Sequence, residues 1–125
     1  MNKNYWGKPT HWGFHLILDC ADGRRDAVSD SKLIADFARR LVKDIDMVAY
    51  GEPQVVLFGT GHLRGYTLIQ LIETSNICGH FCSESGDLYL DVFSCKPYDK
   101  EVVKQLTGEY FGFKSMRETY LVRQA

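Results

Sequence analysis

Apolar and polar residues follow one another along the chain in patterns that predict two helices and six strands. Residues 13–20 are mostly apolar and predict a buried strand. In the segment that follows, apolar residues recur at helical spacing, and Asp30 or Ser31 is suited to cap the helix. These apolar positions are Leu33, Ile34, Phe37, Ala38, Leu41 and Ile45. A second helix is expected over about residues 99–110.

The other strands are bounded by glycine-rich or polar segments. Residues 54–58 are β-branched and aromatic, which favours a strand, and residues 66–73 are apolar on both faces, which is typical of a central strand. Residues 77–82 and 88–95 predict a hairpin around the turn at 83–87, and residues 118–122 predict a last strand. The segments 22–30 and 59–65 are expected to be loops.

The alternation along residues 88–95 indicates how the sheet is covered. Leu88, Leu90 and Val92 suit a face that helices cover, while Tyr89, Asp91, Phe93 and Cys95 point the other way. We therefore expect a two-layer α/β (α+β) sandwich, with a mostly antiparallel sheet and helices on one face. The second face is too aromatic for open water, so we expect it to meet a partner subunit or an active site between subunits.

Length and composition limit the class of protein. The chain has 125 residues, 45% of them hydrophobic and 25% charged, and a net charge of -1. This predicts one domain over residues 1–125 and argues against binding to nucleic acid or to a membrane surface. With no apolar leader in view, we expect a cytoplasmic protein whose four cysteines are thiols.

Three side chains on neighbouring predicted strands form a chemical set. Ser75 ends an apolar strand between Thr74 and Asn76, His80 follows five residues later, and Cys95 lies on the next strand. A hydroxyl, an imidazole and a thiol together can carry out carbonyl chemistry, which needs a nucleophile, a base and an acid.

The order and spacing of these residues resemble the short prokaryotic S-adenosylmethionine decarboxylases, which make a pyruvoyl cofactor from an internal serine. The resemblance runs from about residue 13 to residue 99. It implies that Ser75 forms the pyruvoyl group, that His80 and Thr67 assist this processing, and that Cys95 is the catalytic proton donor. The family's Gly-x-His is present as Gly13-Phe-His15.

The resemblance also implies a sequence of reactions. The Ser75 hydroxyl would attack the Thr74 carbonyl, and β-elimination would then break the resulting ester. The products would be a β chain, 1–74, and a pyruvoyl-blocked α chain, 75–125, paired as a homodimer of αβ units whose sheets face one another. The pyruvoyl carbonyl would form a Schiff base with the substrate and accept electrons during decarboxylation, in the service of spermidine synthesis.

Several residues are candidates for contact with the substrate. They are Glu73, His62 and Phe81. The family uses aromatic rings to hold the adenine and the sulfonium. Cys82 stands where the resemblance predicts such a ring, so Phe81, Trp6 or Trp12 would have to supply it.

Departures from the family pattern leave alternatives open. The family usually has glutamate before the serine and histidine after it, where this chain has Thr74 and Asn76. One alternative is a pyruvoyl decarboxylase of arginine or ornithine with the same fold. Another is an unprocessed, inactive homologue that binds a ligand or partners an active subunit. A third is a zinc site formed by Cys78, His80 and Cys82 with Cys95 across the hairpin.

Overall fold

The computed structural model describes residues 11–125, which form one six-stranded sheet with the strand order β2-β3-β4-β5-β1-β6. All neighbouring strands in it are antiparallel. The strands are β1 (Gly13–Ala21), β2 (Gln54–Phe58), β3 (Gly65–Ile72), β4 (Ser75–Cys82), β5 (Leu88–Ser94) and β6 (Ser115–Arg123). The sheet places the two ends of the described chain side by side, because β1 pairs with β6.

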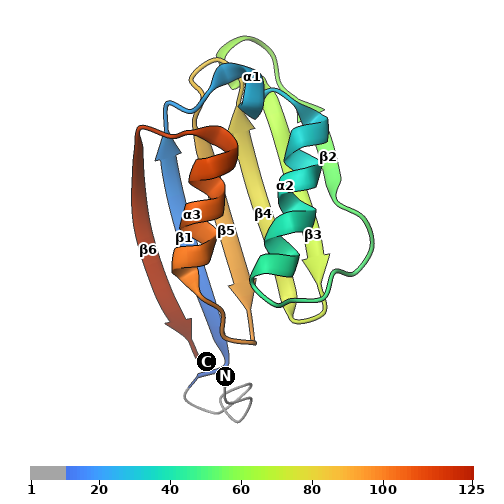
Figure 1. Cartoon of the computed structure of the whole chain (residues 1–125), viewed down its shortest axis with the longest axis vertical. Coiled ribbons are helices and arrows are strands. Elements are labelled where there is room, and N and C mark those ends of the chain that lie inside the picture. The colour runs from blue at the N-terminus through green and yellow to red at the C-terminus, as the bar shows by residue number, and fades with distance from the viewer. Residues whose placement is uncertain (1–10) are drawn as a thin grey trace.

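Three helices cover one face of this sheet (Figure 1). They are α1 (Arg25–Val28), α2 (Ser31–Asp44) and α3 (Lys100–Phe111). The predicted cap of α2 is confirmed, since the Asp30 carboxylate accepts hydrogen bonds from the backbone N–H groups of Lys32 and Leu33. α3 is capped in the same way by Asp99 and ends at Gly112, which has a φ of 64°.

An aromatic cluster joins the two layers. The Phe111 ring of α3 lies 5.1 Å from the Phe37 ring of α2 and 5.1 Å from the Phe81 ring of β4, measured between ring centroids. All three side chains are buried. Burial of such large rings removes much apolar surface from water and fixes α2 and α3 over the centre of the sheet.

A buried tyrosine links the middle of the sheet to the segment before α3. The Tyr98 hydroxyl donates to the carbonyl oxygen of Val92 at 2.6 Å and accepts from the Leu16 N–H at 3.0 Å. Burial raises the pKa of this phenol well above its usual value. Tyr98 therefore supplies hydrogen bonds to two adjacent strands, β1 and β5, within the core.

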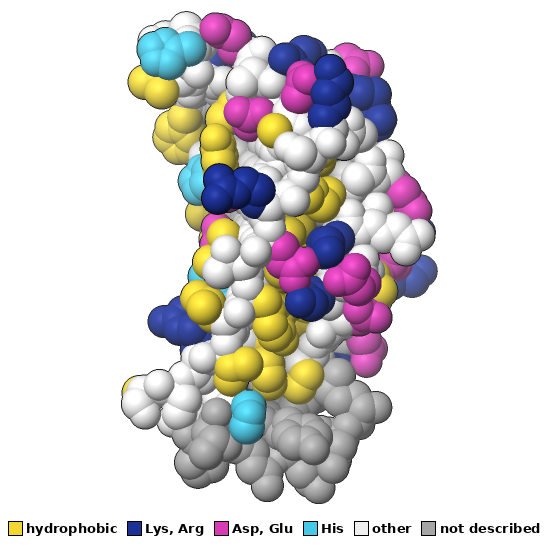
Figure 2. Space-filling view, turned by 90° about the vertical axis from the view of Figure 1, so that its left-hand side faces the viewer, with side chains coloured by type: hydrophobic (Ala, Val, Ile, Leu, Met, Phe, Trp, Pro, Cys, Tyr) yellow, Lys and Arg dark blue, Asp and Glu magenta, His cyan; other side chains and the backbone are white. Residues whose placement is uncertain are grey.

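None of the helices in residues 11–125 lies over the other face of the sheet, which we call the open face (Figure 1). On β5 the predicted alternation is confirmed: Leu88, Leu90 and Val92 are buried, and the residues between them are not. In the edge-on view of Figure 2, hydrophobic and histidine side chains gather along the hollowed left-hand side, and Lys, Arg, Asp and Glu gather over the helix layer. Large apolar side chains that share this face by register, each more than a third exposed, are Val56, Phe58, Ile69, Leu71, Tyr89 and Leu121.

The main differences between the structure and the sequence expectation are in three segments. The predicted loop over residues 22–30 contains α1, whose Ala27 and Val28 are buried against the core. β4 begins at Ser75, two residues before the expected start, because Ser75 already pairs with Ile72 and Ser94. β6 is longer than predicted and follows the whole of β1. None of the described helices is long and apolar enough to cross a bilayer.

Candidate active site

Ser75 follows a tight turn whose residues do not favour it. Ile72 and Ser75 are paired, so Glu73 and Thr74 form a two-residue hairpin loop between β3 and β4. Such loops favour glycine, asparagine or aspartate with positive φ. Here the positive φ, 155°, falls on Ser75 itself. A backbone conformation that L-residues rarely adopt is therefore located at the predicted scissile bond.

The Thr74 carbonyl is aligned by the start of the segment after β5. The backbone N–H of Cys95 donates to the Thr74 carbonyl oxygen at 3.0 Å. Ser75 is paired with Ser94, so Cys95 lies beside Ser75 at the same end of the sheet. The structure thus brings Thr74, Ser75 and Cys95 together, and we call these residues the first half-site.

Asn76 contacts the Ser75 side chain, a role that the sequence did not reveal. Its Nδ2 donates to Ser75 Oγ at 3.1 Å, and its Oδ1 accepts from Cys78 Sγ at 3.5 Å. The amide therefore orients the Ser75 hydroxyl. A residue next to the serine in sequence carried no signal of this, because an alternating strand predicts that neighbours point apart.

Thr67 and His80 form a second group on the open face, the second half-site. They are directly opposite each other on β3 and β4, with Thr67 Oγ1 3.4 Å from His80 Nδ1. A hydroxyl at this position can fix the tautomer and orientation of the imidazole. His80 is exposed and Thr67 half-buried, so Nε2 of His80 can face a partner or a ligand.

The two half-sites are separated along β4. Ser75 and His80 are five residues apart on one strand, which corresponds to about 16 Å at about 3.3 Å per residue. His80 pairs with Tyr89, whereas Ser75 pairs with Ser94 at the other end of β5. Within one copy of the chain, His80 is therefore out of reach of the Ser75 backbone.

The three predicted substrate contacts lie in different surroundings. Glu73 is exposed in the turn next to Thr74, close to the first half-site. His62 is exposed in the 3-10 helix η2 (Gly61–Leu63), which precedes the β3 end nearest the second half-site. Phe81 differs from the expectation: it is 1% exposed and packs on Phe111, because it points to the helix layer while His80 and Cys82 point away.

The proposed zinc arrangement does not form. Cys78, His80 and Cys82 alternate with buried residues along β4, as predicted. Cys95, however, lies at the Ser75 end of the hairpin, far from Cys82. Among residues 11–125, no three His, Cys, Asp or Glu side chains are close enough to hold a metal. Burial raises the pKa of the Cys78 and Cys82 thiols, which disfavours the thiolate that zinc binds.

His15 belongs to the open face rather than to the core. Its Nε2 lies 2.8 Å from Asp91 Oδ1 on β5, and its ring lies 5.5 Å from the Phe93 ring. The Phe93 ring also contacts Trp12, 5.8 Å away between centroids. A Cβ on Gly13 would lie 2.7 Å from Phe93, so glycine is needed for this approach.

This aromatic and charged cluster is next to the first half-site, because Phe93 is paired with Asn76. Trp12 is 46% exposed, so its ring is available to a ligand. Trp6 lies outside the described residues.

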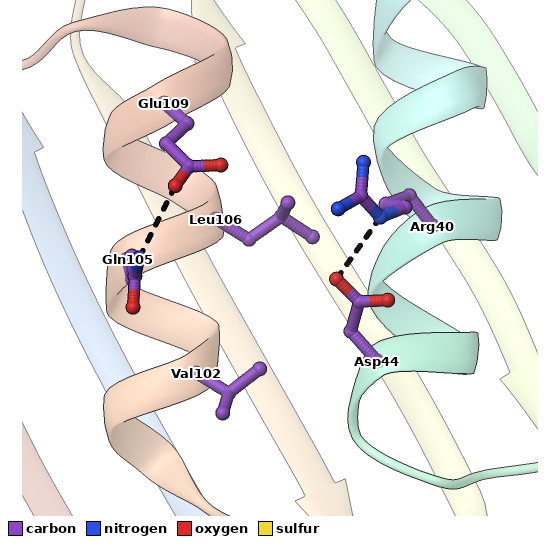
Figure 3. Close-up of a pocket in the computed structure, with 6 residues that line it drawn as sticks. All are labelled: Arg40, Asp44, Val102, Gln105, Leu106 and Glu109. Atoms are coloured by element: carbon purple, nitrogen blue, oxygen red, sulfur yellow. Dashed lines mark hydrogen bonds and ion pairs between the residues drawn. The ribbon is translucent and has the colours of Figure 1, made fainter.

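Of two small cavities, one adjoins the site and the other is remote from it. One of about 100 Å³ adjoins the first half-site and is lined by Asp46, Met47, Val48, Glu73, Thr74 and Lys96. Another of about 150 Å³ lies between α2 and α3, where Arg40 pairs with Asp44 and Gln105 donates to Glu109 (Figure 3). The second cavity is in the helix layer, so the sheet separates it from the open face.

Comparison with known proteins agrees with these features. A family model described as S-adenosylmethionine decarboxylase matches residues 14–124. The S-adenosylmethionine decarboxylase proenzyme of Clostridium botulinum is 22% identical over 112 residues, which cover 89% of this chain and 93% of that protein.

The fold also matches the crystal structure of the adenosylmethionine decarboxylase from Aquifex aeolicus. The TM-score is 0.80 at 19% sequence identity, and the match covers 93% of each chain. The predicted antiparallel sandwich is thereby confirmed. Since the family model spans nearly all of the described sheet and helices, the chain belongs to the S-adenosylmethionine decarboxylase family, a family of carboxy-lyases.

Proposed function

We propose that this protein decarboxylates S-adenosylmethionine with a pyruvoyl group that it makes from its own Ser75, and that the product supplies the aminopropyl group for spermidine. Cleavage at the Thr74–Ser75 bond would leave a β chain, 1–74, and an α chain, 75–125. The observation that carries the proposal is the first half-site, where Ser75 has a positive φ and the Cys95 N–H is aimed at the Thr74 carbonyl oxygen.

The first half-site fits the formation of the pyruvoyl group. Ser75 directly follows the Thr74 carbonyl in the chain, and a hydrogen bond from Asn76 orients Ser75 Oγ. As Ser75 Oγ attacks, negative charge develops on the Thr74 carbonyl oxygen, where the Cys95 N–H already donates. A donor placed on a developing oxyanion lowers the barrier of acyl transfer.

The next step needs a base that takes the α-proton of Ser75, and His80 is the candidate. Because His80 lies about 16 Å from Ser75 along β4, we propose that it comes from a second copy of the chain. Two open faces in contact would bury the exposed apolar residues of β2, β3, β5 and β6. In a two-fold dimer, each second half-site can meet the partner's first half-site.

In turnover, the pyruvoyl group would supply a carbonyl electron sink for loss of carbon dioxide. The thiol of Cys95, beside Ser75, is then placed to return a proton to the product. The exposed ring of Trp12 lies near the same end of the sheet and can attract a sulfonium cation. The neighbouring Phe93 ring already carries the guanidinium of Arg123, 5.3 Å from its centroid. The remaining proposed substrate contacts are Glu73, exposed in the turn, and His62, which the second copy would contribute.

The alternatives are less favoured. Both relatives described above are named as decarboxylases of S-adenosylmethionine, and neither name refers to arginine or ornithine. The inactive-homologue reading predicts that the contacts around the scissile bond are lost. These contacts are instead present. Asn76 donates a hydrogen bond to Ser75 Oγ, and the Cys95 N–H donates one to the Thr74 carbonyl oxygen. We propose a cytoplasmic location for this activity.

Release of labelled carbon dioxide from carboxyl-labelled S-adenosylmethionine tests the proposal. We expect release by the purified wild type and none by Ser75→Ala, with arginine and ornithine as parallel substrates. Release from either amino acid but not from S-adenosylmethionine would reverse the substrate assignment. No release from any of the three would contradict the enzymatic proposal.

A further inference from the structure

The side chain of Thr74 lies in a network of four groups, which we call the Thr74 network. The backbone N–H of Lys96 donates to Ser94 Oγ at 2.9 Å, and Ser94 Oγ is 2.7 Å from Thr74 Oγ1. Thr74 Oγ1 in turn lies 3.3 Å from Met47 Sδ. Ser94 is fully buried, and Thr74 and Ser94 are 20 residues apart in sequence.

The sulfur of Met47 is the acceptor shared by the two hydroxyls of this network. A backbone N–H can only donate, and a thioether sulfur can only accept. Ser94 Oγ therefore accepts from Lys96, and it also lies 3.6 Å from Met47 Sδ. Whichever hydroxyl donates to the sulfur, the other donates to its neighbouring hydroxyl, so Ser94 and Met47 hold the Thr74 side chain together.

The network and the Cys95 N–H hold Thr74 from two sides. Its carbonyl oxygen accepts from the Cys95 N–H, and its side chain is held by Ser94 and Met47. The turn itself offers no glycine or asparagine that would favour this geometry. The turn conformation, including the positive φ at Ser75, therefore depends on contacts from the segments 47–49 and 94–96.

We infer that Ser94 and Met47 are positioning residues for self-cleavage: through the Thr74 hydroxyl, they hold the Thr74 carbonyl carbon in line with Ser75 Oγ. The inference rests on the proposed function. It assigns these residues to the first covalent step and not to the chemistry of decarboxylation, since neither touches a reacting atom.

The step in question is an acyl shift. The bond between Ser75 Oγ and the Thr74 carbonyl carbon forms, the Thr74–Ser75 C–N bond breaks, and the proton of the hydroxyl goes to the released amine. The following elimination removes the Ser75 α-proton and breaks the Cβ–Oγ bond, which leaves Thr74 as a carboxylate. Water then replaces the nitrogen and releases ammonia. Only the first step depends on the angle at which Oγ approaches the carbonyl.

The test follows cleavage in time after pulse-labelled cell-free synthesis of the full chain. The variants are Ser94→Ala, Thr74→Val, their double variant, and Thr74→Ser, which keeps the hydroxyl. Thr107→Val is the matched control, because Thr107 is fully buried like Ser94 and its hydroxyl donates a hydrogen bond away from the turn, to the Val103 carbonyl in α3. Thermal unfolding of each substitution in a Ser75→Ala background reports its effect on folding alone.

We expect cleavage to slow about tenfold in Ser94→Ala and in Thr74→Val, the order of one lost hydrogen bond. The double variant should be no slower than the slower single variant, while Thr74→Ser and Thr107→Val should cleave at close to the wild-type rate. Hydroxylamine, which cleaves esters, should not accelerate the slow variants, because their ester has not formed. His80→Ala should accumulate the ester and respond to hydroxylamine.

Two results would overturn the inference. One is wild-type cleavage rates in Ser94→Ala and Thr74→Val, and the other is rapid hydroxylamine cleavage of both, which would move their effect to the elimination step. If Ser94→Ala does not fold, the comparison of Thr74→Val with Thr74→Ser decides alone. A wild-type chain that never cleaves would instead contradict the proposed function, so the two failures are distinguishable.

Discussion

Ser75 and His80 lie on the same strand, β4, yet they face different neighbours: Ser75 is paired with Ser94, and His80 is paired with Thr67 and Tyr89. Five residues of extended chain cover about 16 Å, several times the length of a hydrogen bond. If both residues serve one reaction, they must come from two copies of the protein.

Mixing two inactive variants tests this arrangement. Ser75→Ala keeps His80, and His80→Ala keeps Ser75, so a mixed dimer contains one site with both native residues. We expect the His80→Ala chain to be cleaved when the two variants are co-expressed and to remain largely intact when expressed alone. Mass analysis of a tagged His80→Ala chain measures this. Equal cleavage with and without the partner would place the reaction within a single chain.

A charge on the open face should separate the two copies. Ile69 lies on this face about midway along β3 and is 38% exposed. Since burying an unpaired ammonium group is costly, Ile69→Lys should weaken dimerisation by at least about tenfold. Sedimentation equilibrium in a Ser75→Ala background reports the association.

The matched control for this charge is Gln105→Lys, which adds a lysine at an exposed position of α3. It should leave association unchanged. Unchanged association in Ile69→Lys as well would mean that the open face is not the dimer interface.

Tyr98 should contribute strongly to stability through its hydroxyl. Tyr98→Phe leaves the buried Leu16 N–H without its acceptor, and such a loss costs about 1–3 kcal/mol. Denaturant unfolding of Ser75→Ala with and without Tyr98→Phe measures the difference in the free energy of unfolding. Tyr50→Phe is the control, because Tyr50 is 69% exposed. Equal losses in the two variants would contradict a structural role for the Tyr98 hydroxyl.

Cys20 should make stability fall at alkaline pH. Burial, with a smaller effect of Asp19, raises the pKa of the Cys20 thiol from 9.0 to about 12. In the unfolded chain this thiol ionises above pH 9.0, whereas in the folded chain it stays protonated. The unfolded state then binds fewer protons, so stability decreases between pH 9.0 and about 12.

Cys20→Val removes this group while keeping an apolar side chain. Its melting temperature should therefore fall less steeply than that of the wild type between about pH 8 and about pH 10.5. Parallel curves for the two proteins would show that Cys20 ionisation does not contribute.

Sequence patterns predict the parts of this fold that repeat at short range. Helical spacing and Asp30 identify α2, and the alternation on β5 identifies its buried face. The same alternation on β4 could have excluded Phe81 from the substrate site, because it lies between two open-face residues, His80 and Cys82. The chemical spacing of Ser75, His80 and Cys95 led to the correct family.

Long-range contacts explain what the sequence did not reveal. Thr74 meets Ser94 and Met47 only because β5 and the segment after α2 converge on the β3–β4 turn. No periodicity marks such a meeting of side chains 20 and 27 residues apart. The strand order is equally hidden, since nothing in the pattern of β6 indicates that it pairs with β1 at the far end of the chain.

The intact mass of the purified protein under denaturing conditions tests the central claim most directly. The account predicts two chains that divide between Thr74 and Ser75, with the C-terminal chain lighter by one ammonia than a chain that begins with a free serine. A single chain with the full mass of the 125-residue sequence would contradict it.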